Sequence, residues 1–210
     1  MKLYNIHVGM LETNCYILMN EENNQALIVD PGADAGRILS AVEELKLEKI
    51  DGILVTHCHS DHIGALHEVR QAVKAPVYIG SIDAAGLGDP EVNLSRWMGT
   101  DIATFAAEKT VEDGDVINVA GFELKVLLTP GHTPGGVCFY NEANNLCFVG
   151  DTIFCESIGR TDFPGGSYKQ ILASIKTKLF ALDNETRLLP GHGPATTVAW
   201  EKKRNPFVQE

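Results

Sequence analysis

The residues His57-Cys58-His59-Ser60-Asp61-His62 place four side chains of metal-ligating type within six positions. The segment directly before them, Ile53-Leu54-Val55, is apolar and rich in β-branched residues, which predicts a buried strand that ends at the motif. Side chains alternate along an extended chain, so the first, third and fifth residues share one side and Cys58 points away. A helix then begins, and its turn is expected to bring His62 to the same side as the other ligands. A solvated histidine-rich loop is the alternative, but this density of ligand types after a buried strand favours a metal site.

Three further candidates stand alone in the sequence, each after an apolar segment and each next to glycine. They are His132 in Thr129-Pro130-Gly131-His132-Thr133, Asp151 in Val149-Gly150-Asp151-Thr152 and His192 in Pro190-Gly191-His192-Gly193. A turn residue or a satisfied polar group would explain any one of them alone. Because all three share this loop context and accompany the motif at 57–62, we interpret them as ligands of the same centre.

The number of candidate ligands indicates how many ions the centre holds. One catalytic zinc ion needs three protein ligands and a water molecule, whereas this set offers five histidines and two aspartates. Two divalent ions therefore fit better. We expect this assignment: His57, His59 and His132 at one ion, Asp61, His62 and His192 at the other, and Asp151 as a bridge.

This arrangement predicts a hydrolase. A hydroxide held between two metal ions is a nucleophile for carbonyl and phosphoryl groups near neutral pH, and we expect Asp61 to orient it and Asp151 to hold the two ions together. Zinc is the favoured metal. Iron and manganese are alternatives, because histidine and aspartate bind all three metals and availability often decides between them.

Length, charge and cysteine content narrow the class of protein further. The 210 residues contain no linker-like stretch, which predicts a single domain over residues 1–210. A formal net charge of −11 argues against a nucleic-acid partner, since phosphate binding relies on clustered lysine and arginine. The five cysteines are odd in number and lack C-x-x-C spacing, which is typical of reduced, cytoplasmic thiols. No export signal or membrane segment is expected, and composition does not indicate an oligomeric state.

Strands and helices are expected in an order that predicts an α/β fold. Strands are expected at Asn14–Met19, Ala26–Asp30, Ile53–Val55, Val77–Ile79, Val116–Val119, Glu123–Leu128, Val137–Tyr140, Leu146–Val149 and Arg187–Leu189. Helices are expected from Asp34, from Asp61 to Val73 and from Ser167, where apolar residues recur at helical spacing. The order favours two sheets packed face to face with helices on both outer faces. The two halves also look alike, which suggests an internal duplication.

The pattern H-x-H-x-D-H followed by three isolated ligands resembles the metallo-β-lactamase superfamily. The resemblance extends from Val29-Asp30-Pro31-Gly32 to Pro190-Gly191-His192-Gly193 and covers nearly the whole chain. It implies a four-layer αββα sandwich with the metal ions at one edge, between the two sheets. It also implies the ligand roles proposed above, and places Asp30 as a supporting residue behind the ions.

Within that superfamily the chain is similar to the short glyoxalase II-like proteins. The similarity rests on residues 129–135, on Gly159-Arg160-Thr161-Asp162-Phe163 and on Asn205-Pro206-Phe207. It implies hydrolysis of S-acylglutathione thioesters such as S-lactoylglutathione. Two departures stand out: the C-terminal helical domain with which longer glyoxalase II enzymes grip glutathione is missing, and Ala65 replaces a glycine common among relatives.

Other activities remain as alternatives. A glutathione persulfide dioxygenase shares residues 159–163 but uses one iron and three ligands, and His192 argues against it because that family lacks a second complete site. Hydrolysis of another ester, a lactone or a phosphoester uses the same centre. β-Lactam hydrolysis is disfavoured without a signal peptide, and RNA processing is disfavoured by the acidic charge. A metal-binding module without catalysis would be expected to have lost at least one ligand.

Three residues are candidates for substrate binding. The guanidinium of Arg160 suits a substrate carboxylate, because it forms bidentate pairs; an internal salt bridge with Asp162 is the alternative. Phe154 and Phe163 are candidate pocket residues, with core packing as the alternative.

Overall fold

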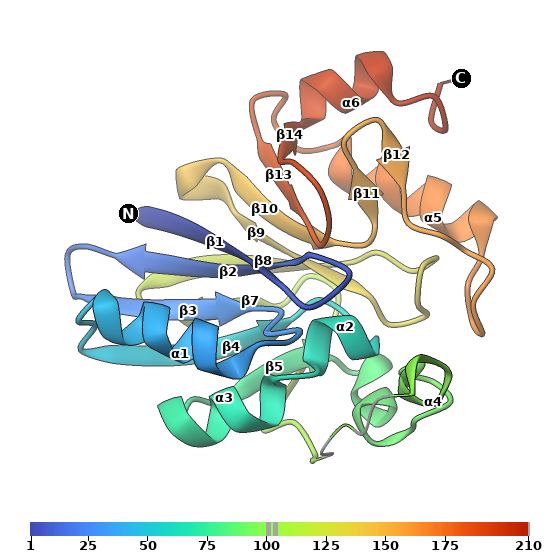
Figure 1. Ribbon diagram of the computed structural model, residues 1–210. Helices are drawn as coiled ribbons and strands as arrows, with labels where there is room; N and C mark the ends of the chain where they lie inside the picture. The colour runs from blue at the N-terminus through green and yellow to red at the C-terminus, as the bar shows by residue number, and fades with distance from the viewer. Residues whose placement is uncertain (100–101, 103–104, 210) are drawn as a thin grey trace.

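The computed structural model describes residues 1–99, 102 and 105–209. In this part of the chain, two six-stranded sheets pack against each other (Figure 1). The first sheet has its strands in sequence order: β1 (Lys2–Val8), β2 (Thr13–Asn20), β3 (Gln25–Val29), β4 (Lys49–Val55), β5 (Val77–Gly80) and β6 (Lys109–Val111). The second sheet runs in the order β14 (Thr196–Thr197), β13 (Arg187–Pro190), β10 (Leu146–Gly150), β9 (Val137–Asn141), β8 (Phe122–Leu128) and β7 (Val116–Val119). A small hairpin joins β11 (Ile153–Phe154) to β12 (Ser157–Ile158).

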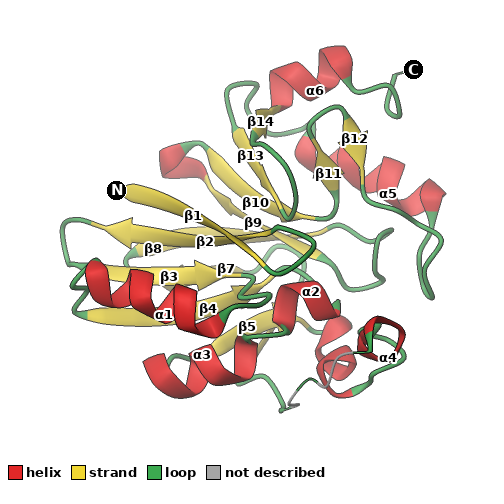
Figure 2. Cartoon of the chain, viewed as in Figure 1, coloured by secondary structure: helices red, strands yellow, loops and turns green. Residues whose placement is uncertain are grey.

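Helices cover the outer faces of both sheets (Figure 2). The first sheet carries α1 (Ala35–Glu44) and α3 (Leu66–Val73). The second carries α5 (Tyr168–Ser174), which continues as a π-helical turn at Ile175–Leu179, and α6 (Val198–Arg204). Shorter helices are α2 (Ser60–Ile63) and α4 (Ser95–Met98), with 3-10 turns at Asp83–Gly88 and Glu142–Asn144. None of the helices in the described residues is long and apolar enough to span a membrane.

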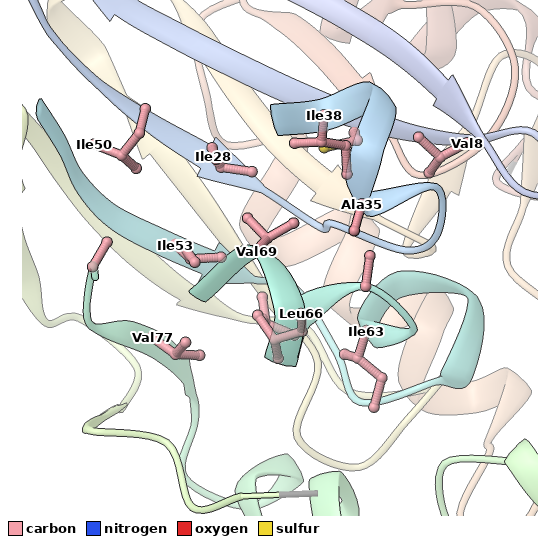
Figure 3. Packing of buried hydrophobic residues seen from close by; sticks show 14 of the residues in the cluster. Val8, Ile28, Ala35, Ile38, Ile50, Ile53, Ile63, Leu66, Val69 and Val77 are labelled. Atoms are coloured by element: carbon pink, nitrogen blue, oxygen red, sulfur yellow. The ribbon is translucent and has the colours of Figure 1, made fainter. Parts of the chain in front are cut away.

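Three separate apolar cores lie between the four layers. Alternation along the strands creates them, because neighbouring side chains point to opposite faces of a sheet. On β4, Ile53 packs under α1 and α3 in the first core, while the next residue, Leu54, packs between the two sheets. Figure 3 shows the first core, where Ile38 of α1 and Val69 of α3 meet the strands. The third core lies between the second sheet and α5 and α6. The structure thus has the four layers expected from the sequence.

The two sheets share a strand pattern that brings their loops to one edge. In the first sheet, β2 pairs antiparallel with β3, and β3 pairs parallel with β4. In the second, β9 pairs antiparallel with β10, and β10 pairs parallel with β13. Asp30 follows β3 and Asp151 follows β10, while His57 follows β4 and His192 follows β13. Parallel strands end at the same edge of a sheet, so these loops lie at one edge of each sheet. Because the two sheets pack face to face, corresponding loops of the two halves face one another.

The helix predicted from Asp61 to Val73 is wrong as one element. It is broken into α2 and α3, because the chain between them packs tightly against an earlier loop. The Ala65 amide donates to the Pro31 carbonyl at 3.0 Å, and a Cβ on Gly64 would lie 2.4 Å from the Gly32 carbonyl oxygen. These contacts to the loop after β3 turn the backbone between the two helices.

Candidate metal centre

The seven predicted ligands converge at the edge where β3, β4, β10 and β13 end. Three overlapping groups of three have all their ligand atoms within 4.8 Å of one another. These groups are His57, His59 and His132; His57, His62 and Asp151; and Asp61, His62 and His192. Side chains separated by more than a hundred residues in sequence therefore form one cluster.

Local backbone geometry explains how the motif at 57–62 supplies so many of these groups. The chain bends at Thr56, directly after β4, and is extended at His59, which has φ −64° and ψ 148°. It then turns into α2, which carries Asp61 and His62 back toward the same point. Cys58 lies on the opposite side, buried in the first core, where its thiol packs beside Gly86.

The first group consists of three buried histidines. Nδ1 of His59 lies 2.8 Å from Nε2 of His132, and the rings of His57 and His132 are 4.8 Å apart. Nε2 of His57 is buried and has no hydrogen-bond partner. Three imidazole nitrogens thus face a common point, as a tetrahedral metal site with one open position requires.

The second group lies beside the first and is more open to solvent. Nε2 of His192 lies 3.1 Å from Oδ2 of Asp61, and Nε2 of His62 lies 3.6 Å from the same oxygen. The side chains of Asp61 and His192 are 21% and 25% exposed, whereas His62 is fully buried. This group therefore faces the outside of the cluster, where a substrate can approach.

Asp151 lies between the two groups. Its Oδ1 is 3.3 Å from Nε2 of His62, and its Oδ2 is 3.6 Å from Nε2 of both His132 and His192. One carboxylate thus reaches histidines of both groups, which is the position expected of a bridging ligand. Gly191 permits this approach, because a Cβ there would lie 2.2 Å from Oδ1 of Asp151.

The residues fit a metal ion on the evidence of their unpaired atoms. Nε2 of His57, Nε2 of His62 and Oδ1 of Asp151 are all buried without a hydrogen-bond partner. Buried polar atoms are nearly always paired, so three unpaired ligand-type atoms in one cluster fit a metal-binding role. Imidazole nitrogens and carboxylate oxygens suit zinc, iron and manganese alike.

Four of the five histidines contact a supporting group through Nδ1, as metal-binding histidines usually do. Nδ1 of His62 contacts Oδ2 of Asp30 at 2.9 Å, and the same oxygen accepts a hydrogen bond from the Thr56 hydroxyl at 2.7 Å. Nδ1 of His132 contacts the Arg160 carbonyl at 2.8 Å. Nδ1 of His192 contacts the carbonyl of Leu11 at 3.0 Å. These bonds leave the Nε2 atoms directed into the cluster.

Burial and mutual repulsion keep two of the histidines ready to bind a cation. Burial, together with the nearby His62, lowers the pKa of His57 well below its usual value. Burial and the neighbouring His132 lower the pKa of His59 to about 3. Both rings are therefore neutral near pH 7, with a lone pair free for a metal.

The carboxylates remain ionised despite their burial. Burial alone would raise the pKa of Asp61 and of Asp151, but His62, the other nearby histidines and the hydrogen bonds to these carboxylates together lower both. Burial would likewise lower the pKa of His62, yet the carboxylates of Asp151 and Asp61 raise it well above its usual value. The negative potential that holds a proton on His62 also attracts a metal cation.

Comparison with known proteins decides the family. A model of the family described as "Metallo-beta-lactamase superfamily" matches residues 8–192. The chain belongs to this superfamily. It is 39% identical over 209 residues to the "Probable metallo-hydrolase YqgX" of Bacillus subtilis, with 99% of this chain and 98% of the relative covered. It is 34% identical over 205 residues to the "Hydroxyacylglutathione hydrolase GloC" of Haemophilus influenzae, with 97% and 96% covered.

Solved structures of the metallo-β-lactamase superfamily confirm the fold. BLEG-1 B3 metallo-beta-lactamase superposes with a TM-score of 0.95 at 37% identity, covering 100% of both chains. TTHA1623, solved in a di-iron-bound form, gives 0.86 at 34% identity, covering 97% of this chain and 99% of that one. ETHE1 from Myxococcus xanthus gives 0.83 at 29% identity, covering 98% and 84%. The superfamily homologues support a metal-dependent hydrolase.

The candidate substrate residues lie around the rim of this metallo-β-lactamase centre. Arg160 forms a bidentate salt bridge with Asp162, with two N···O distances of 2.8 Å, and its guanidinium lies 3.9 Å from the centre of the Phe163 ring. The internal salt bridge foreseen as the alternative is therefore formed. Phe163 lies 5.5 Å from the His59 ring and Phe154 lies 6.1 Å from the His192 ring. The two phenylalanines thus flank the two ligand groups.

Sequence reasoning missed the residues that hold the His192 loop. Asn14 is fully buried, and its Nδ2 donates to the carbonyls of Pro190 and Gly193 at 2.9 Å each. The hydroxyl of Tyr16 donates to the same Pro190 carbonyl at 2.8 Å. The signal in the sequence was a polar residue, Asn14, directly before the apolar residues of a strand.

Proposed function

We propose that this chain is a dinuclear metal-dependent hydrolase that cleaves thioesters of the S-acylglutathione type, such as S-lactoylglutathione. The observation that carries the dinuclear centre is the position of Asp151, whose two oxygens face histidines of both ligand groups. Metal ions bound there would supply a water molecule activated near neutral pH and a positive charge for the developing oxyanion. Zinc is the proposed metal, with iron and manganese as alternatives.

The chain's own residues favour a substrate with a good leaving group. Outside the seven proposed ligands, the described side chains in contact with these histidine rings include Phe154 and Phe163, and also Thr56 and Asp30, which are hydrogen-bonded to each other. We find no free general acid among these contacts. A thiol with a pKa near 8.5 leaves as a thiolate without one, whereas an amide nitrogen must be protonated. Asp61, which is partly exposed and faces His192, is placed to accept a hydrogen bond from the attacking water.

Similarity to the hydroxyacylglutathione hydrolase GloC over nearly the whole chain supports a glutathione thioester as substrate. Cleavage consumes one water: the C–S bond breaks, a C–O bond forms, and a carboxylic acid and a thiol leave. The proposal also includes Arg160, Phe154 and Phe163 as rim residues that contact the substrate. With Arg160 paired to Asp162, its contact with a substrate carboxylate would require it to share its guanidinium.

The test is thioester hydrolysis by protein whose metal content has been measured. S-lactoylglutathione is compared with simpler thioesters, and metals per chain are recorded in the same samples. Two metals per chain with turnover of S-lactoylglutathione is the expected result. Full metal content without hydrolysis of any thioester would overturn the proposal.

β-Lactam hydrolysis is a second candidate, because the similarity to BLEG-1 B3 metallo-beta-lactamase covers both chains completely. A chromogenic cephalosporin assayed in the same samples distinguishes the two activities.

A glutathione persulfide dioxygenase remains the other alternative, supported by the shared segment at 159–163. One iron per chain and oxygen consumption with glutathione persulfide would favour it. The paired histidine groups around Asp151 argue for two ions instead.

A further inference from the structure

A groove of about 400 Å³ lies next to the metal centre. It is bounded by the loop between β1 and β2, by the start of α1 and by the turn between α2 and α3. Its apolar lining includes Val8, Met10, Leu11, Ala33, Ala35 and Met98. Its volume falls within the usual range for small-molecule sites.

The groove is continuous with the second ligand group. Asp61 lines the groove, and Oδ2 of the same side chain lies 3.1 Å from Nε2 of His192. Leu11 also belongs to both, since its side chain lines the groove and its carbonyl contacts Nδ1 of His192. A molecule with its reacting carbonyl at this group can therefore extend into the groove.

The groove's rim exposes large apolar side chains to solvent. Met10 is 94% exposed, Leu11 50% and Met98 44%. Apolar side chains gathered beside a polar centre mark a binding surface more often than chance exposure does. Methionine is flexible and polarizable, so it adapts to alkyl groups of different shape.

The charges along the groove select against an anion. Besides Asp61 of the ligand group, its described lining contains Asp34 and Glu68 but neither lysine nor arginine. Asp34 is paired with Arg37 at 3.3 Å, which leaves the carboxylate of Glu68 as the stronger negative charge at the wall. A carboxylate of glutathione would be repelled here, whereas an uncharged alkyl chain gains from burial.

We propose that this groove binds the acyl chain of the substrate, and that the enzyme prefers thioesters of uncharged, apolar acyl groups longer than acetyl or lactoyl. This inference rests on the proposed thioesterase function. The thiol portion then lies on the other side of the centre, toward Phe163 and Arg160.

The first experiment measures kcat/KM on N-acetylcysteamine thioesters with acetyl, lactoyl, butyryl and hexanoyl groups. Each buried methylene can raise kcat/KM by up to about fourfold, and we expect a rise of at least about tenfold from acetyl to hexanoyl. A second series keeps the acetyl group and lengthens the thiol with alkyl groups. Equal values across the acyl series, or a preference that follows the thiol instead, would overturn the proposal.

Variants locate the effect in the groove. In Met10→Ser/Leu11→Ser, the ratio of hexanoyl to acetyl kcat/KM should fall to within about twofold of unity, since the apolar wall is lost. Val116→Ser removes a comparably exposed apolar side chain on β7, outside the lining, and should keep the full ratio. A double variant that retains the full ratio would contradict the assignment.

A binding measurement separates this inference from the proposed function. The chain has four methionines: Met1, Met10, Met19 and Met98. With ¹³C-methyl-labelled methionine, titration with hexanamide should shift the Met10 and Met98 signals and leave Met1 and Met19 in place. Signals are assigned by single Met→Leu variants. Absence of any shift at Met10 and Met98 would overturn the assignment of the groove as the acyl-binding site. Absence of all thioester hydrolysis with the shifts present would overturn only the thioesterase function.

Discussion

Asp30 and His62 form a buried pair in which Oδ2 of the aspartate lies 2.9 Å from Nδ1 of the histidine. The backbone amide of Thr56 donates to the other oxygen of Asp30 at 2.8 Å. The carboxylate therefore ties the end of β4, just before the histidine motif, to a ring on α2. When a metal ion replaces the proton on Nε2 of His62, this contact would keep the remaining proton on Nδ1.

Replacing Asp30 with asparagine should weaken metal binding about 10- to 100-fold, as is usual when a supporting partner of a metal-binding histidine is lost. The amide can present a donor to Nδ1 and so favour the wrong tautomer of His62. Competition with a chelator of known affinity measures the change. Asp183→Asn, at an exposed acid far along the chain, is the matched control. Unchanged affinity in the Asp30 variant would remove its supporting role.

Replacing Asp151 with alanine should abolish turnover and metal retention together. The expected cause is loss of a carboxylate that reaches both histidine groups. Elemental analysis and kcat on the same preparation check both at once. Asp162→Ala, which removes an exposed acid from the rim, should leave metal content unaltered. An active Asp151 variant with two metals would show that the bridge is not needed.

Asn14→Ala should selectively affect the ion at the Asp61, His62 and His192 group. Without the Nδ2 donor, the buried carbonyl of Pro190 loses one of its two hydrogen bonds, and the His192 loop is less firmly held. We expect metal content to fall from two toward one per chain and unfolding to cost about 1–3 kcal/mol less. Gln209→Ala removes an exposed amide–carbonyl hydrogen bond and serves as control. Loss of both ions equally would argue against a local effect.

Gly191→Ala should disrupt the centre even though only a methyl group is added. The new Cβ would lie 2.2 Å from Oδ1 of Asp151 and 2.5 Å from Cε1 of His62, so both must move. Metal content and melting temperature should fall together. Gly36→Ala is the contrasting variant, because a Cβ at this position in α1 meets nothing within 4 Å. Alanine favours helix there by about 1 kcal/mol, so that variant should melt no lower than the parent.

The sequence predicted the strand ends better than the contacts across the sheets. Short apolar segments ending in histidine or aspartate identify strands locally, so the edge that carries His57 and Asp151 could be foreseen. The hydrogen bond from Asn14 to the Pro190 carbonyl joins residues 176 positions apart and has no local signature in the sequence. The break between α2 and α3 has no local signature either, because it depends on a contact with Pro31.

Elements with weak periodicity also escaped prediction. The strand β1 has three exposed and three half-exposed residues among its seven, and α6 is short and strongly charged, so neither shows a clear apolar pattern. The role of Arg160 could not be decided from sequence either. Its two alternatives differ only in whether Asp162, two residues away, comes within reach, and the structure shows that it does.

Because buried atoms at the centre lack hydrogen-bond partners, metal binding should affect the stability of the folded chain as well as catalysis. Any ion that binds only the native chain shifts the folding equilibrium, by about 4 kcal/mol at a free concentration a thousand times its dissociation constant. For a chain of this length, each kcal/mol corresponds to about 2–4 °C in melting temperature. Thermal unfolding followed with and without a chelator should show such a shift. The fraction of this protein that stays folded would then follow the availability of the metal.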